Sequence, residues 1–238
     1  MYLKNTIQKF EKIGGQFLTI PETLANSIRT AKAFIFDWDG VFNDGQKNGS
    51  GTSNFNEIDS MGVNLMRFSY WVNYKRMPLT AVISGEHNTA SFFWTKREHF
   101  TACYYKIAKK TEALEHFCAQ NKIKPSEVVF VFDDVLDLSI AKQAGVKIFI
   151  SRKSNPLFND YVAKQKLADY ITANESNHYA VREACEMIMG LQDIYDKVVT
   201  ERVNYSPIYQ TYIETRNAGI TNYFTRQTEG IVELTPAS

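Results

Sequence analysis

Short apolar runs recur along the chain, and helical patterns lie between them. Four runs, at 32–39, 78–84, 127–134 and 146–151, are almost continuously apolar, and a weaker fifth lies at 102–107. Continuous apolar residues, as opposed to alternating ones, are typical of strands buried on both faces, as in parallel sheets. Strands that alternate with helices in this way predict an α/β fold with a doubly wound, Rossmann-like parallel sheet flanked by helices.

Two of the intervening segments carry a clear helical pattern. Residues 111–120 and 179–190 each place their apolar side chains on one stripe of a helix. A third helix, over 137–144, is expected to end at Gly145, because glycine favours the left-handed conformation just beyond a helix. Cys103, Cys118 and Cys185 fall on these stripes or strands and are predicted to be core thiols.

The chain divides into a central α/β core and two extensions. Residues 32–191 hold the expected strands and helices, and residues 1–31 precede them with one or two predicted helices. Residues 192–238 form a C-terminal extension that is rich in tyrosine and polar residues and has no clear period. Within the core, residues 42–56 are rich in turn formers and predict a short flap, either a flexible loop or a polar hairpin.

Charge and composition exclude several classes of function. The 238 residues include 27 Lys and Arg against 26 Asp and Glu, so no global charge favours nucleic acid or an anionic membrane. Neither a run of 18 apolar residues nor a signal peptide is recognised, which predicts no membrane span. The cysteines are odd in number and lack CxxC spacing, which suits reduced thiols in a cytoplasmic protein.

Carboxylates follow two of the expected strands. Asp37 and Asp39 end the strand at 32–39, and Asp133 and Asp134 end the strand at 127–134, with Asp137 a turn later. Ser84 ends another strand, and Lys110 begins a helix after the weak one. Since ligands of an open parallel sheet gather outside the carboxyl ends of its strands, these side chains are expected to converge on one crevice.

Clustered carboxylates repel one another, and a divalent cation with oxygen ligands is the simplest compensation. Magnesium fits best, because it binds a few carboxylates together with water and a substrate phosphate. One aspartate of the first pair would then act as nucleophile and metal ligand, and the other as acid and base. Ser84 and Lys110 would supply a hydrogen bond and a positive charge to phosphoryl oxygens. The expected partner is thus a small phosphate ester.

The order "DWDG", "SG", Lys and "DDVLD" resembles the motifs of the haloacid dehalogenase (HAD) superfamily of phosphatases. "DGVFNDG", "FNEIDSMGVNL" and "ISGEH" resemble a narrower branch, the small, capless, usually tetrameric phosphatases of 3-deoxy-2-ulosonic acid phosphates. The resemblance covers roughly residues 32–190. It implies a HAD-type sheet without a large cap domain, phosphatase activity on a sugar-acid phosphate, and a homotetramer.

The resemblance also implies roles for individual residues. Asp37 would form an aspartyl-phosphate, and Asp39 would protonate the leaving alcohol and then activate water. Ser84 and Lys110 match the phosphate-binding positions. The implied metal site consists of Asp37, Asp39, Asp133 and Asp134. The direct ligands would be the Asp37 side chain, the Asp39 backbone carbonyl and Asp133, and Asp134 and Asp137 would support these ligands without binding the ion themselves. Residues implied to contact the sugar acid are Gly85, Glu86 and Arg97.

The chain departs from the family pattern at several points. Phe132 replaces the glycine before the second aspartate pair, and Trp94 and its neighbours replace an arginine-rich helix start. The flap is shorter and more polar than the family's, and "NESNHYAVRE" keeps the "VRE" of a C-terminal motif without its glycines. None of these changes removes a residue of the hydrolytic machinery.

Other functions compete with the sugar-acid phosphatase. The same chemistry would serve another sugar phosphate or a nucleotide. A receiver-type signalling domain also uses an aspartate cluster with Ser or Thr and Lys, but there the acidic pair comes first in the chain, whereas here it comes late. A non-catalytic descendant that works as a binding protein would normally have lost an essential aspartate, and none is lost here.

Overall fold

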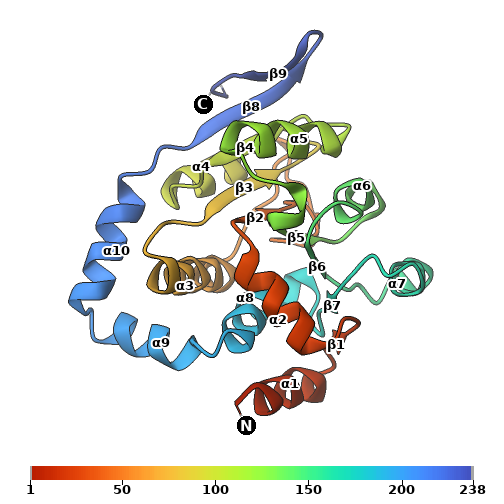
Figure 1. The fold of residues 1–238 in the computed structure, drawn as a ribbon. Helices are drawn as coiled ribbons and strands as arrows, with labels where there is room; N and C mark the ends of the chain where they lie inside the picture. Colours follow the sequence, from red (N-terminus) through yellow and green to blue (C-terminus); the bar gives the residue numbers. More distant parts are fainter. Residues whose placement is uncertain (1, 237–238) are drawn as a thin grey trace.

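In the computed structural model, which describes residues 2–236, one sheet runs through the whole protein (Figure 1). Its strands are β1 (Gln16–Phe17), β2 (Ala33–Phe36), β3 (Leu79–Ile83), β4 (Ala102–Tyr105), β5 (Val128–Phe132), β6 (Val146–Phe149), β7 (Tyr170–Ile171), β8 (Asn222–Gln227) and β9 (Gly230–Glu233). They are ordered β1-β7-β6-β5-β2-β3-β4-β8-β9. All strands from β7 to β8 are parallel, and β1 and β9 are antiparallel at the two edges.

Helices cover both faces of the sheet. The α-helices are α1 (Tyr2–Ile13), α2 (Pro21–Thr30), α3 (Glu57–Tyr74), α4 (Thr89–Arg97), α5 (Lys110–Asn121), α6 (Leu138–Ala141), α7 (Pro156–Lys164), α8 (Ala180–Leu191), α9 (Tyr195–Val203) and α10 (Pro207–Asn217). Short 3₁₀ turns are η1 (Pro125–Glu127), η2 (Val135–Asp137) and η3 (Ser176–His178). One apolar core lies between the sheet and α2, α3, α4 and α8, and a second lies between the sheet and α5, α6 and α7.

The predicted fold class is confirmed. All five expected strands form as β2 to β6; β2, β4 and β5 are buried at every residue, and β3 and β6 at all but one. The stripes predicted at 111–120 and 179–190 are the buried faces of α5 and α8. Cys103, Cys118 and Cys185 are buried and unbridged, as core thiols should be.

At four places the structure adds to the sequence prediction, corrects it, or decides between its alternatives. The N-terminal extension holds two helices, as expected, and also the short edge strand β1. Of the two alternatives for the flap, residues 42–56 adopt the loop, with a turn held by the Asn48 side chain. Gly145 is not left-handed, which corrects the prediction; a Cβ there would lie 1.9 Å from the Ser126 carbonyl oxygen, so glycine permits a close backbone approach. The described part of the C-terminal extension, residues 192–236, forms α9, α10, β8 and β9, of which only the helices lie outside the sheet.

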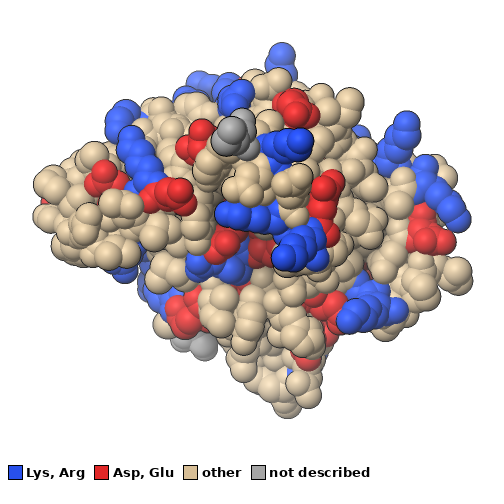
Figure 2. All heavy atoms as spheres, turned by 90° about the horizontal axis from the view of Figure 1, so that it is seen from below, with Lys and Arg blue, Asp and Glu red and all other residues tan. Residues whose placement is uncertain are grey.

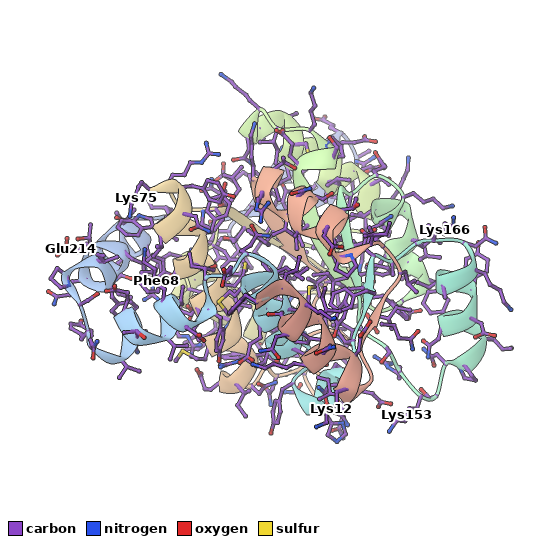
Figure 3. The ribbon with its side chains drawn as sticks, turned by 60° about the horizontal axis from the view of Figure 1, so that its bottom comes forward. Lys12, Phe68, Lys75, Lys153, Lys166 and Glu214 are labelled. Atoms are coloured by element: carbon purple, nitrogen blue, oxygen red, sulfur yellow. The ribbon has the colours of Figure 1, made fainter. Side chains whose placement is uncertain are left out.

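The C-terminal extension wraps around α3 before it rejoins the sheet (Figure 1). Phe68 of α3 packs against Tyr209 and Tyr212 of α10, with ring centroids 5.2 and 4.9 Å apart (Figure 3). The chain then crosses to β8, which pairs with β4. The extension is therefore packed on the core that carries the predicted site.

The surface seen in Figure 2 mixes basic and acidic side chains without a large area of one sign, in keeping with a formal net charge of +1. Between residues 2 and 236, every helix is too short or too polar to cross a membrane.

Candidate active site

β2 lies in the middle of the sheet, between β5 and β3. From there the chain adds β3 and β4 on one side and β5, β6 and β7 on the other. Asp37 directly follows β2 and donates its backbone N–H to Val131 of β5, 3.0 Å away. Asp133 follows β5, and Ser84 follows β3. A topological switch point of this kind is where open α/β sheets bind their ligands.

Three carboxylates and one ammonium form the centre of the site. Oxygens of Asp37, Asp133 and Asp137 lie within 4.8 Å of one another, and all three residues are buried. Lys110 Nζ, at the first residue of α5, lies 2.6 Å from Asp37 Oδ1 and 2.6 Å from Asp137 Oδ1. The convergence expected from the strand ends is therefore present for Asp37, Asp133 and Lys110.

The cluster carries more negative charge than its two cations offset. Burial and the charge of Asp137 raise the pKa of Asp37 to about 7, against the opposing effect of Lys110. Burial and the charges of Asp37 and Asp137 raise the pKa of Asp133 to about 9, although Arg152 opposes the shift. Burial alone would lower the pKa of Lys110, but the two carboxylates it contacts raise it. A divalent cation would relieve the surplus negative charge.

Asp133 has one side-chain oxygen that is free to bind a cation. Its Oδ2 accepts a hydrogen bond from Arg152, whereas its Oδ1 is buried and has no partner among the described residues. An unsatisfied buried carboxylate oxygen is costly, and a cation at that position would satisfy it. The donor set is oxygen only, which suits a hard cation such as magnesium.

The turn after β5 decides which further aspartate joins the cluster. Asp134 caps the η2 turn, where its Oδ1 accepts from Val135 N at 2.6 Å, and its side chain is exposed. Asp137 is fully buried, and its second oxygen accepts from Asp134 N at 3.2 Å. The structure thus brings Asp137, and not Asp134, next to Asp37 and Asp133. The assignment of the metal ligands stays a prediction.

Asp39 lies at the edge of the site, under the flap. Its Oδ2 is 2.6 Å from Lys47 Nζ, and its Oδ1 accepts from Ser53 Oγ. Both partners belong to residues 42–56, so the flap loop is tied to the predicted acid and base. A backbone bridge between Asp39 and Asn43 closes the turn between them.

Ser84 is buried at the end of β3, and its hydroxyl accepts from the Glu86 backbone N–H at 3.1 Å. Its backbone bonds to Tyr104 and Ile107, which fixes the segment leading to Lys110. Gly85 and Glu86 are exposed just beyond it. These three residues therefore lie at the same edge of the sheet as Asp37.

Arg97 is engaged by neighbouring protein groups. At the last residue of α4, its Nη2 donates to Glu57 Oε2 at 3.2 Å and to Ser60 Oγ at 2.7 Å. Its Nε donates to Glu98 at 3.0 Å. No hydrogen bond or ion pair joins Arg97 to the aspartate cluster among residues 2–236. Its contact with substrate stays a prediction.

Two basic residues at the site were not anticipated. Arg152 contacts Asp133, and Lys47 contacts Asp39. Arg152 directly follows a run that the sequence identifies as a strand, so the argument applied to the other strand ends would also have found it. Lys47 lies in the flap, where no periodic pattern locates a side chain.

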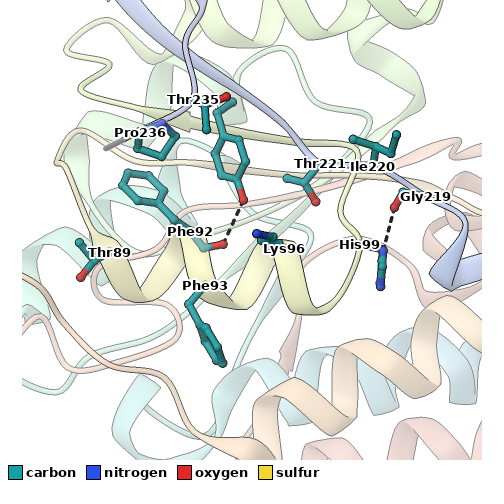
Figure 4. Close-up of a pocket in the computed structure, with 11 residues that line it drawn as sticks. Thr89, Phe92, Phe93, Lys96, His99, Gly219, Ile220, Thr221, Thr235 and Pro236 are labelled. Carbon is teal, nitrogen blue, oxygen red and sulfur yellow. Dashed lines mark hydrogen bonds between the residues drawn. The ribbon is translucent and has the colours of Figure 1, made fainter. Parts of the chain in front are cut away.

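A separate pocket of about 460 Å³ lies between α4, the segment that leads into β8, and the residues that follow β9 (Figure 4). Its walls include Phe92, Phe93 and Ile220, and Tyr223 donates to the Phe92 carbonyl at 3.2 Å. None of the predicted site residues lines it. The predicted site residues lie instead at the carboxyl ends of the strands.

No family model matches the chain. In sequence it resembles 3-deoxy-D-manno-octulosonate 8-phosphate phosphatase of Yersinia pestis, with 25% identity over 166 residues, which cover 68% of this chain and 81% of that protein. In structure it resembles a Legionella pneumophila protein assigned to the HAD superfamily (subfamily III A) of hydrolases, with a TM-score of 0.63 at 22% identity, covering 76% of this chain and 94% of the other.

The structure of the Moraxella catarrhalis octulosonate phosphatase in complex with magnesium, phosphate and KDO gives a TM-score of 0.61 at 23% identity, and covers 74% of this chain and 96% of the other. The structural likeness establishes the fold, and the sequence likeness points to the same group of proteins. This chain has the HAD hydrolase fold and resembles the HAD phosphatases of the 3-deoxy-D-manno-octulosonate 8-phosphate type.

Proposed function

We propose that this protein is a magnesium-dependent phosphomonoesterase of a sugar-acid phosphate. The observation that carries the proposal is the buried Lys110, which binds Asp37 and Asp137 beside the unpartnered oxygen of Asp133. A nucleophilic carboxylate, a fixed cation and an oxygen-only cation site together suit phosphoryl transfer. The relatives named as phosphatases support the same activity.

Asp37, Asp133 and the Asp39 carbonyl would hold the magnesium ion, with Asp137 and Asp134 around them. When bound, the ion would neutralise charge on the phosphoryl oxygens. Asp137 is held by Lys110 and by the Asp134 backbone, which keeps its carboxylate in place.

The chain's own residues carry the reaction. A carboxylate oxygen of Asp37 attacks phosphorus, the bond to the ester oxygen breaks, and Asp39 gives its proton to the departing alkoxide. Asp39 then takes a proton from water, whose oxygen attacks the aspartyl-phosphate and releases inorganic phosphate and the free Asp37 carboxylate. Lys110 and Ser84 bind phosphoryl oxygens throughout. Because Asp39 is bonded to Lys47 and Ser53, one of these contacts opens when the leaving group arrives.

The proposed substrate class is the 3-deoxy-2-ulosonate phosphates, supported by the name of the Yersinia pestis relative. Glu86 is exposed beside Ser84 and would accept hydrogen bonds from sugar hydroxyls. Arg97 would bind the distal carboxylate in place of Glu57, its present partner, and across a subunit boundary if four copies assemble. The tetramer is part of the proposal, and light scattering after size-exclusion chromatography measures it.

The test is phosphate release by the purified chain, with magnesium and with excess chelator. We expect release only with the metal, and higher kcat/KM for octulosonate and nononate phosphates than for hexose phosphates or nucleotides. Asp37→Asn keeps the shape of the side chain but cannot attack phosphorus, so it should abolish turnover. Asp160→Asn, the same change at an exposed position on α7, is the matched control.

Two results would contradict the proposal at different levels. Preference for hexose phosphates or nucleotides would remove the sugar-acid substrate and leave the phosphatase. A folded Asp37→Asn variant that keeps more than about a tenth of wild-type turnover, a loss of only ~1.4 kcal/mol, would remove Asp37 as nucleophile.

A further inference from the structure

Arg152 is a charged residue at the catalytic centre to which the proposed chemistry gives no role. It follows β6, and its Nη2 lies 2.8 Å from Asp133 Oδ2. The Arg152 side chain is 30% exposed and that of Asp133 is 4% exposed, so the ion pair joins a partly exposed side chain to a buried one.

The ion pair leaves Asp133 with one oxygen engaged and one free. Arg152 takes Oδ2, whereas Oδ1 is buried without a partner among residues 2–236. Since a carboxylate that turned about its side chain would exchange the two oxygens, the contact with Arg152 fixes which oxygen is presented to a cation. The same carboxylate belongs to the cluster with Asp37 and Asp137.

The backbone beneath Arg152 is held in place independently of the cluster. Its carbonyl accepts from Asn155 N at 3.0 Å and from Asn159 Nδ2 at 2.9 Å. The preceding Ser151 binds Thr172 twice, through its backbone N–H at 3.2 Å and through its hydroxyl at 2.7 Å. Arg152 therefore projects from an ordered support, as expected of a residue that orients another.

Gly40 packs against the ion pair from the other side. Its φ is +86°, and a Cβ on it would lie 2.0 Å from Asp133 Oδ2 and 2.7 Å from Arg152 Nη2. Gly40 directly follows Asp39, so the backbone just after the two predicted catalytic aspartates packs against the ion pair of Asp133 and Arg152. The pair has little space to rearrange.

We propose that Arg152 is a positioning residue for the metal ion: it holds Oδ2 of Asp133 and thereby presents Oδ1 as a ligand. The inference rests on the metal site of the proposed function. Groups that hydrogen-bond to metal ligands orient them, and their loss typically costs about 10–100-fold in metal affinity. Charge alone predicts the opposite, because removing a cation next to a divalent ion strengthens the binding of that ion.

Positioning and charge therefore predict opposite changes in Mg²⁺ affinity when Arg152 is replaced. Calorimetric titration with Mg²⁺ alone, without substrate, distinguishes them. We expect Arg152→Met to weaken Mg²⁺ binding by about 10- to 100-fold. Arg152→Lys keeps the charge and one donor and should lose less. Lys153→Met removes a neighbouring exposed charge whose side chain has no contact with the cluster, and should bind Mg²⁺ like wild type (Figure 3).

Thermal unfolding without metal establishes which variants are folded. If Arg152→Met does not fold, Arg152→Lys carries the test, and unchanged affinity in that variant would overturn the positioning role. Equal or tighter Mg²⁺ binding by a folded Arg152→Met would overturn it as well. Absence of Mg²⁺ binding by the wild type would overturn the metal site and this inference together. Mg²⁺ binding that depends on Arg152, without phosphate release from any ester, would support the inference while the proposed function failed.

Discussion

Asp37 and Asp39 are separated by one residue but have contrasting surroundings. The Asp37 side chain is 7% exposed and is paired with Lys110, whereas that of Asp39 is 24% exposed and is paired with Lys47. Trp38 between them is buried, and its indole Nε1 donates to the Ser53 carbonyl at 3.3 Å. A buried, fixed carboxylate suits attack on phosphorus, and a partly exposed one suits proton exchange with an alcohol and with water.

Asp39→Asn should therefore slow the first chemical step in a way that depends on the leaving group. Asp37 can still attack, but no acid protonates the departing alkoxide, and such groups typically contribute about 10²–10⁴-fold. A nitrophenyl phosphate, whose leaving group needs little protonation, should lose less than a sugar phosphate. Single-turnover release of each alcohol measures the difference, and equal losses for both would argue against Asp39 as the acid.

At the scale of secondary-structure elements, the central strands that are buried on both faces were predictable, and β8, which lies next to the edge of the sheet, was not. The runs that became β2, β3, β5 and β6 are apolar because both of their faces lie against helices. β8 (NYFTRQ) buries only its middle three residues, so its sequence has neither a continuous nor a clearly alternating pattern. It forms because it pairs with β4, a contact between distant segments that local sequence does not encode.

In the candidate site, too, some residues could be predicted from the local sequence and others could not. Asp37 and Asp133 were predictable because each directly follows a strand with a clear pattern, and Lys110 because it begins the helix after a weaker strand. Whether Asp134 or Asp137 joins them depends on the 3₁₀ turn after β5, which directs Asp137 inward and leaves Asp134 exposed as the cap. Sequence spacing alone does not distinguish two aspartates three residues apart in a turn.

The first turn of α3 contains a buried carboxylate whose ionisation should affect stability. Asp59 is fully buried, and its oxygens accept from Arg182 N at 2.7 Å and from Asn56 Nδ2 at 2.6 Å. Burial raises its pKa to about 6, although these hydrogen bonds oppose the shift. The folded protein therefore holds this proton at pH values where the unfolded chain, with a pKa near 3.8, has released it.

It follows that the free energy of unfolding of the wild type should fall, relative to Asp59→Asn, as the pH rises from about 4 to about 6. The protonated Asp59 stabilises the folded protein fully at pH values below the unfolded pKa, and this stabilisation is lost as the pH rises through the folded pKa. A pKa difference of about two units corresponds to at most about 3 kcal/mol. Urea unfolding at several pH values measures the difference in slope. Parallel curves for the two proteins would show that Asp59 titrates alike in both states.

At the scale of the whole molecule, the C-terminal segment closes one side of the sheet. Phe224 of β8 stacks on Tyr104 of β4 with ring centroids 5.0 Å apart, and it meets His116 of α5 at 4.8 Å. These contacts join β8 to the strand that precedes Lys110 and to the helix that begins at Lys110. The strand is therefore a structural support for the core and contributes no predicted catalytic group.

Phe224→Ala should destabilise the protein by about 3 kcal/mol, the usual cost of removing a buried ring. The kcat of the folded variant should change little, because the ring touches none of the predicted catalytic residues. Ile220→Ala, on the same segment but 81% exposed, is the control and should unfold like wild type. A large fall in kcat at temperatures where Phe224→Ala is fully folded would instead link the C-terminal strand to catalysis.

The pairing of β8 with β4 also bears on how the chain is made. A ribosome releases all of the residues of the candidate site, from Asp37 to Arg152, well before it releases Asn222–Gln227. Until then β4 can pair only with β3, so it is an edge strand, although its four residues are buried in the finished protein. Exposed edges of this kind template pairing with other chains. Between the release of β4 and that of β8 this edge is therefore open to pairing with other chains, and a chaperone that covers it would act during this interval.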